Sequence, residues 1–192
     1  MSDLLSLAVV VPPTLDTDPA ILLARLAGRL GYAAVHVSAE SARDGDFVEA
    51  LARAADPAIV VVDDTGPARG LVRVNDPEQV AAVRRAMNQE GVARPLLVAV
   101  PVSIGRTMNE AVARADREPR FAGDRHPRVS GIFGTFEQAQ EQVLALARAG
   151  ADGLVVDVPV ELDFADVLAQ VKALVVGATP ALLAHPGSTE KD

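Results

Sequence analysis

The sequence predicts an α/β fold built around a mainly parallel sheet. Short runs of β-branched and other apolar residues alternate with longer segments of helical periodicity, an order typical of βα units. Most of these short runs are almost continuously apolar, as expected for strands that are covered on both faces. Apolar residues make up 49% of the chain and charged residues 23%, which is the composition of a globular domain.

The expected strands follow one another at regular intervals. They are Leu5–Val11, Ala33–Ser38, Ala58–Asp63, Leu96–Val102 and Gly153–Val158, with Leu71–Val74 as a weaker sixth. Residues 115–132 are charged, interrupted by proline and without periodicity, which predicts a long surface loop. We expect one domain over residues 1–186 and a flexible polar tail over residues 187–192.

Residues that favour helix ends mark the helices between these strands. An acidic or hydroxyl side chain is expected to cap each N-terminus, and a glycine ends most of the helices. Thr135 and Gln138 have the spacing of a capping box, and a last helix is expected over Phe164–Val175. The expected N-caps are Asp18, Asp76, Thr135 and Asp163, and the expected stops are Gly31, Gly91 and Gly150.

The composition argues against several classes of function. The chain has no cysteine, which excludes disulfides and thiolate chemistry. His36, His126 and His185 lack metal-ligand spacing, so we expect no metal site. A net charge of −8 argues against nucleic-acid binding. No apolar run reaches the roughly 18 residues of a spanning helix, and the N-terminus lacks a basic region, so we expect a cytoplasmic protein without membrane contact.

Three segments resemble the luciferase-like monooxygenase family of flavin- and F420-dependent oxidoreductases. Residues 9–37 are similar to its opening strand, helix and second strand, residues 94–107 to a strand late in the fold, and residues 131–159 to the last helix and strand. The resemblance implies a (β/α) barrel that binds FMN or F420 at the C-terminal ends of its strands. It further implies an oxidoreductase or monooxygenase that acts on a small organic substrate.

The chain departs from the family pattern in two places. Only five or six strands are expected instead of eight, so the barrel is shortened or incomplete. After the second strand, where the family often has an acidic residue and two histidines, the chain reads Ser38-Ala-Glu-Ser41. An alternative is therefore a non-catalytic shortened paralogue that binds flavin or serves as a partner subunit. A third interpretation is an unrelated phosphate-binding barrel enzyme. An incomplete barrel exposes strand edges, so we expect a homodimer.

Two turns are candidate contacts for a cofactor phosphate. Ser103 and Arg106 combine a hydroxyl, a guanidinium and a helix start, which together attract phosphate. The same turn is also explained as an ordinary strand-to-helix connection capped by Thr107. Gly134 and Thr135 form a similar turn, which the capping box explains equally well. No catalytic residue is assigned.

Other polar residues end the remaining strands, where function collects in parallel α/β folds. Asp63 and Asp64 are either an acid/base or metal pair or two solvated acids. His36 lies within a strand and is either a pocket acid or base or a hydrogen-bonded core residue. The other strand-end candidates are Thr14, Ser38, Glu40 and Asp157.

Overall fold

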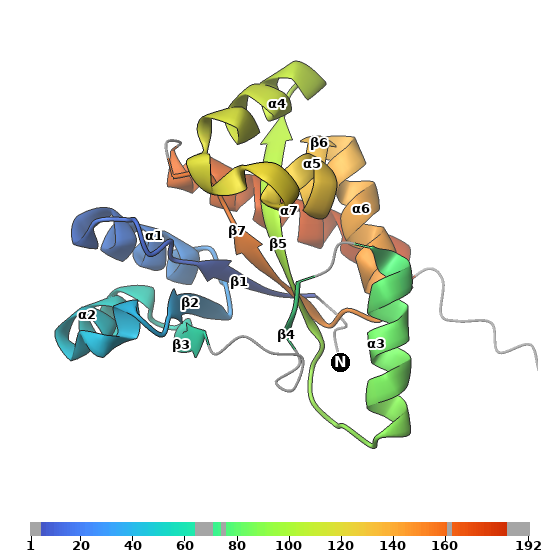
Figure 1. Cartoon of the computed structure of the whole chain (residues 1–192), viewed down its shortest axis with the longest axis horizontal. Helices are drawn as coiled ribbons and strands as arrows, with labels where there is room; N and C mark the ends of the chain where they lie inside the picture. The colour runs from blue at the N-terminus through green and yellow to red at the C-terminus, as the bar shows by residue number, and fades with distance from the viewer. Residues whose placement is uncertain (1–4, 64–70, 74–75, 161–162, 184–192) are drawn as a thin grey trace, which may run out of the picture.

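A parallel sheet with helices on one face forms the fold (Figure 1). The computed structural model describes residues 5–63, 71–73, 76–160 and 163–183. Within these residues the sheet has seven strands, in the order β3-β2-β1-β7-β5-β4, and β6 pairs with β5. Because β3 and β4 are the two ends of this path, the described strands do not close into a barrel. The expected α/β fold with an open, shortened barrel is confirmed.

The strands agree closely with the predicted runs, and one of them was not predicted. They are β1 (Ser6–Val10), β2 (Ala34–Ser38), β3 (Ile59–Asp63), β4 (Leu71–Val72), β5 (Leu97–Gly105), β6 (Ile132–Thr135) and β7 (Gly153–Asp157). The unpredicted strand is β6, because a four-residue run with a glycine in it has no clear periodicity. It pairs in parallel with the C-terminal half of β5.

Seven α-helices and several short 3-10 turns connect the strands in the described residues. The helices are α1 (Thr17–Arg29), α2 (Gly45–Ala55), α3 (Pro77–Gln89), α4 (Met108–Arg117), α5 (Pro127–Ser130), α6 (Phe136–Arg148) and α7 (Phe164–Leu183). The turns are η1 (Ser41–Arg43), η3 (Pro119–Phe121) and η4 (Gly123–Arg125). No helix in the described part of the chain has both the length and the apolar character needed to cross a membrane.

Most of the predicted helix ends are confirmed. The Asp76 carboxylate accepts a hydrogen bond from the N–H of Glu78, and the capping box of α6 has both of its hydrogen bonds. Glycines with positive φ follow α1, α3 and α6 as expected. The prediction of Asp18 as an N-cap is wrong, because α1 begins at Thr17 with Asp16 in the cap position. Helix α7 also runs beyond the expected end at Val175.

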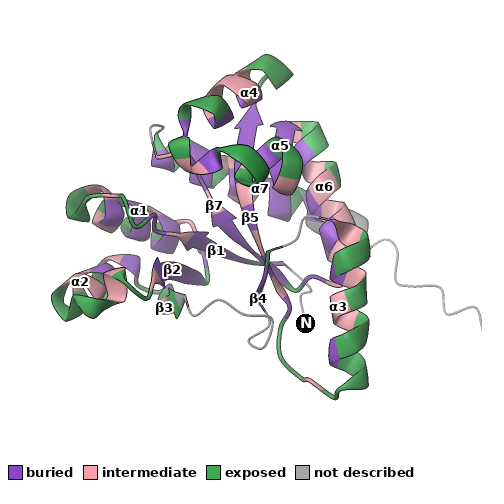
Figure 2. Ribbon diagram, in the orientation of Figure 1, coloured by how far each residue is buried: buried purple, intermediate pink, exposed green. Residues whose placement is uncertain are grey.

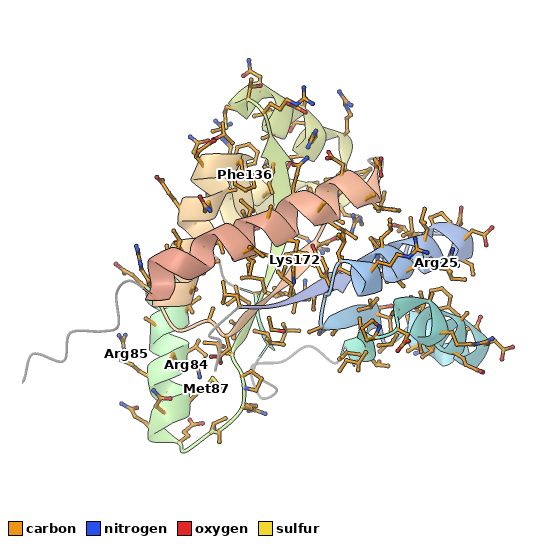
Figure 3. All side chains as sticks on the ribbon, turned by 180° about the vertical axis from the view of Figure 1, so that it is seen from behind. Arg25, Arg84, Arg85, Met87, Phe136 and Lys172 are labelled. Carbon is orange, nitrogen blue, oxygen red and sulfur yellow. The ribbon has the colours of Figure 1, made fainter. Side chains whose placement is uncertain are left out.

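The main hydrophobic core lies between the sheet and the helices. Alternate strand residues such as Val9, Val35 and Val156 face this layer and are fully buried. Helix α1 packs against α2 and α7, and α6 packs against α7. Figure 3, seen from the back of Figure 1, shows α7 crossing in front of the sheet, where Lys172 Nζ donates a hydrogen bond of 3.2 Å to the carbonyl of Gly31. The exposed surface of the helices faces away from this core (Figure 2).

The opposite face of the sheet, here called the cavity face, carries smaller side chains. Ala8, Ala34, Leu71 and Val155 form its buried cluster, and Ala99 packs against them. The interior of a closed barrel is usually filled by layers of bulky branched residues. Alanines on an open sheet leave space beside the strands on this face.

Residues 115–132 are not the surface loop that the sequence predicts. They end α4 and form η3, η4 and α5, and Figure 1 shows this segment in front of the C-terminal part of β5. Phe121 is buried with Ala111, Ala115 and Phe133 in a small second core. The prediction fails because Phe121 anchors the segment in this small core and Glu118 is buried in an ion pair with Arg120, although most of the other charged residues of the segment remain exposed.

Candidate functional site

A cavity of about 570 Å³ opens on the cavity face at the C-terminal ends of the strands. This is within the usual size range of small-molecule sites. Its apolar lining is Val10, Val11, Pro13, Ala99, Val100, Pro101, Phe121 and Val155, and its polar lining is Thr14, Ser38, Arg73, Arg120, Asp124, Arg125, Ser130 and Asp157. Strands β1, β2, β5 and β7 thus form one wall, and the segment from η3 to α5 contributes another.

The strand register separates apolar from polar lining residues. Ala99 pairs with Val155, and two residues further along the same strands Pro101 pairs with Asp157. Because the strands are parallel, all their C-terminal ends meet at one edge of the sheet. The polar groups at this edge therefore come from several strands and lie together, with the apolar pair behind them.

Three charged side chains form a network beside the cavity. The guanidinium of Arg120 donates to Asp157 Oδ1 at 2.5 Å, to the carbonyl of Val158 at 2.8 Å and to both oxygens of Glu118 at 2.8 and 3.0 Å. Glu118 is only 3% exposed, and its Oε2 also accepts a hydrogen bond of 2.9 Å from the N–H of Val160. Arg125 Nη2 lies 3.9 Å from Asp157 Oδ2. The network joins η3 to the end of β7.

The two carboxylates of this network respond oppositely to their surroundings. Burial raises the pKa of Asp157, and the positive charges of Arg120 and Arg125 offset this only in part. Burial also raises the pKa of Glu118, but hydrogen bonds from Arg120 and the Val160 N–H outweigh it, so this pKa is lowered. A carboxyl with a raised pKa that lines a cavity is a candidate functional group.

The residues predicted to contact a cofactor phosphate come together, but outside this cavity. The pairing of β5 with β6 sets Ser103 beside Phe133, Ile104 beside Gly134 and Gly105 beside Thr135. Arg106 follows immediately after β5. The two turns are therefore neighbours at the C-terminal edge of the sheet, although none of the four predicted residues lines the cavity.

Most polar groups of these two turns are engaged within the protein. The buried Ser103 hydroxyl donates to the carbonyl of Ala111 at 2.9 Å. The Thr135 hydroxyl accepts from the N–H of Gln138 in the capping box. Gly134 has a φ of 123°, and a Cβ there would lie 2.5 Å from Gln138 Oε1. The expected capping role of Thr135 is confirmed.

Arg106 is the exposed member of the predicted phosphate contacts. Its backbone N–H donates to Glu110 Oε2 at 2.9 Å, and Thr107 caps α4 by accepting from the N–H of Glu110 at 3.2 Å. The turn thus has the ordinary strand-to-helix geometry that the sequence allows. The exposed guanidinium is still available to a ligand, and the phosphate role of the four residues stays a prediction.

The remaining candidates are placed as follows. His36 is buried in β2 at 4% exposure. Asp63 ends β3, but Asp64 lies outside the described residues, so the pair is not tested. Glu40 is exposed, whereas Thr14 and Ser38 line the cavity with Asp157. No group of three His, Asp or Glu side chains in the described part of the chain is arranged to hold a metal ion.

Sequence reasoning missed Glu118, Arg120 and Arg125, because it assigned their segment to a solvated loop. One signal was available. Glu118 and Arg120 flank Pro119, and a buried Phe121 follows, a pattern in which an apolar anchor brings a charged pair against the fold.

Comparisons with solved structures support the fold. The apo form of MsnO8 is 14% identical, with a TM-score of 0.54, and the match covers 91% of this chain and 98% of that one. The monooxygenase RslO1 from Streptomyces bottropensis is 11% identical, with a TM-score of 0.51, and the match covers 95% and 100% of the two chains. No family model and no curated protein matches the sequence. At these identities the likeness shows a shared fold.

Proposed function

We propose that the chain is a luciferase-like oxidoreductase that uses FMN or F420 and acts on a small organic substrate. The observation that carries this proposal is the 570 Å³ cavity at the C-terminal ends of parallel strands, where barrel enzymes place their active sites. The fold is similar to that of a monooxygenase, RslO1. The sequence resemblance to the family points in the same direction.

The chain offers groups that fit both parts of such a cofactor. The apolar lining around Ala99, Val155 and Phe121 suits a flat ring system. Arg106, together with the turns at Ser103 and at Gly134 and Thr135, is the proposed contact for the phosphate. Redox chemistry would be supplied by the cofactor, while the protein binds and orients it.

Fluorescence titration with FMN and with F420 tests the proposal. We expect one of the two to bind, and Arg106→Ala to weaken binding by about 10- to 100-fold, because a hydrogen bond to a charged group contributes about 1.5–3 kcal/mol. Arg85→Ala is the matched control, because Arg85 is exposed on α3 (Figure 3) and does not line the cavity. Binding that is equally strong in both variants would remove Arg106 from the site.

The open sheet favours a second candidate function, a non-catalytic paralogue that acts as a flavin-binding or partner subunit. The path of described strands ends at β3 and β4, and the stretch after β2 has no histidine. If neither cofactor binds, the partner-subunit form of this second function is supported and the first function is rejected.

We further propose that the chain forms a homodimer. Strand β3 is at one end of the sheet path, and its Ile59 and Val62 are 63% and 45% exposed. Burying these side chains and the edge of the strand against a second copy would remove apolar surface from water.

A further inference from the structure

We propose that Asp157 takes a proton from an acidic hydroxyl group on a substrate with an apolar ring, and that Arg120 positions Asp157 for this step. The role of this proton transfer in a reaction rests on the proposed function, in which an oxidoreductase oxidises the ring of the substrate after its hydroxyl group has been ionised. The binding and the proton transfer themselves require only the residues of the cavity.

The two oxygens of Asp157 have different surroundings. Oδ1 accepts the hydrogen bond from Arg120 Nη1 at 2.5 Å. Oδ2 lies 3.9 Å from Arg125 Nη2, beyond hydrogen-bonding distance, and it accepts no hydrogen bond from any other described residue. The side chain lines the cavity and is 14% exposed. One oxygen is therefore fixed by the protein, and the other is left for a ligand.

Arg120 is held in place independently of any ligand. Besides Asp157 it contacts Glu118 and the carbonyl of Val158, and Glu118 is in turn bound by the N–H of Val160. These contacts fix the guanidinium from two sides, so it cannot turn away to another partner. Arg120 thus sets the direction of the Asp157 carboxyl before a substrate enters, which lowers the cost of orienting it.

The charges around the cavity select a hydroxyl over other polar groups. The charged residues near Asp157 are Glu118 and Arg120 at η3, Asp124 and Arg125 at η4, and Arg73 after β4. With Asp157 included, three arginines stand against three carboxylates, so an amine or a carboxylate is attracted by one set and repelled by the other. A neutral hydroxyl enters without either penalty and can donate its hydrogen bond to Asp157 Oδ2.

The proton transfer is balanced within the cavity. The O–H bond of the substrate breaks, its electron pair stays on the oxygen, and the proton forms a bond to Oδ2. The resulting oxyanion faces Arg125, whose positive charge stabilises it. Burial raises the pKa of Asp157, which makes its carboxylate a stronger base than an exposed aspartate. The apolar residues Val10, Ala99, Val155 and Phe121 then contact the ring.

The first experiment compares 4-nitrophenol with its methyl ether, 4-nitroanisole, as probes of the protein without cofactor. Because only the phenol has a hydroxyl, we expect wild type to bind it at least about tenfold more tightly than the ether, the effect of one hydrogen bond to a charged group. Asp157→Asn is expected to reduce this ratio to below about threefold. Asp46→Asn is the matched control, because Asp46 is exposed in the first turn of α2 and does not line the cavity, and it should keep the wild-type ratio.

The second experiment follows carboxyl carbons by 13C NMR during a pH titration. We expect one carboxyl with a raised pKa that disappears in Asp157→Asn, a higher pKa of this carboxyl in Arg120→Met, and a return towards wild type in Arg120→Lys. A purely structural role of Arg120 would leave the pKa unchanged in any variant that folds. Equal binding of phenol and ether, or the absence of the raised pKa, overturns the inference. Failure of FMN and F420 to bind overturns only the proposed function.

Discussion

Replacing Glu118 by glutamine is expected to destabilise the protein strongly although the two side chains have almost the same shape. Glu118 Oε1 accepts from the backbone N–H and Nε of Arg120 at 3.3 and 2.8 Å, and Oε2 accepts from Arg120 Nη2 and the Val160 N–H at 3.0 and 2.9 Å. In glutamine one of the two oxygens is replaced by an NH2 group. Whichever way the amide is turned, two hydrogen bonds are lost and the NH2 group faces the N–H donors that the oxygen accepted from.

The size of the effect follows from these contacts. Hydrogen bonds to charged groups contribute about 1.5–3 kcal/mol each, so losing two of them costs about 3–6 kcal/mol. Arg120 keeps Asp157 and the Val158 carbonyl as partners, which places the expected loss at the lower end, about 3 kcal/mol. For a domain of this size, that corresponds to a decrease in Tm of roughly 6–12 °C.

Urea denaturation followed by circular dichroism measures this loss, with Glu141→Gln on the exposed surface of α6 as the matched control. Burial raises the pKa of Glu118, but its hydrogen bonds and the charge of Arg120 have the larger effect, so the net pKa in the folded protein is lowered. The stabilisation is therefore complete above the pKa of the unfolded chain and is lost as pH falls through the lower folded pKa. The difference between wild type and variant should shrink in acid. A loss below about 1 kcal/mol, or one independent of pH, would refute the reasoning.

Three further predictions concern packing and assembly. Gly28→Ala should lower the Tm although alanine favours helices, because the new Cβ would lie 2.1 Å from the carbonyl oxygen of Ala55. Gly45→Ala is the control and should not lower the Tm, because its Cβ would have no atom within 4 Å. Leu168→Ala should cost about 3–5 kcal/mol in urea denaturation, since Leu168 is fully buried on α7, and a loss below about 1 kcal/mol would contradict its place in the core. Light scattering should give the mass of a dimer, and a monodisperse monomer would contradict the proposed covering of β3.

The strands and most helix ends were predictable because local rules decide them. Apolar runs such as Leu96–Val102 are confirmed as strands, and Asp76 and Thr135 cap helices as expected. Strand β6 was not predictable in this way, since its pairing with β5 comes from residues about thirty positions earlier in the chain. Its four residues have too few alternations to show a period.

The candidate site was predictable in its location but not in its residues. The rule that function lies at strand ends selects Thr14, Ser38 and Asp157, which do line the cavity. The partners of Asp157 come from a charged segment that the sequence alone predicts to be a surface loop. Arg120 is placed at the cavity by Phe121, whose burial depends on α4 and β6 and therefore on the tertiary fold.

The position of β1 in the sheet has a consequence for synthesis and folding. Its residues from Ser6 to Val9 pair with Gly153 to Val156 of β7, so the first strand of the described chain finds one of its neighbours only after almost all the others exist. A nascent chain on the ribosome therefore carries an unpaired, apolar strand edge for most of its synthesis, a state prone to aggregation. Truncations upstream of Gly153 should collect in inclusion bodies, and productive expression should depend on chaperones that shield this edge.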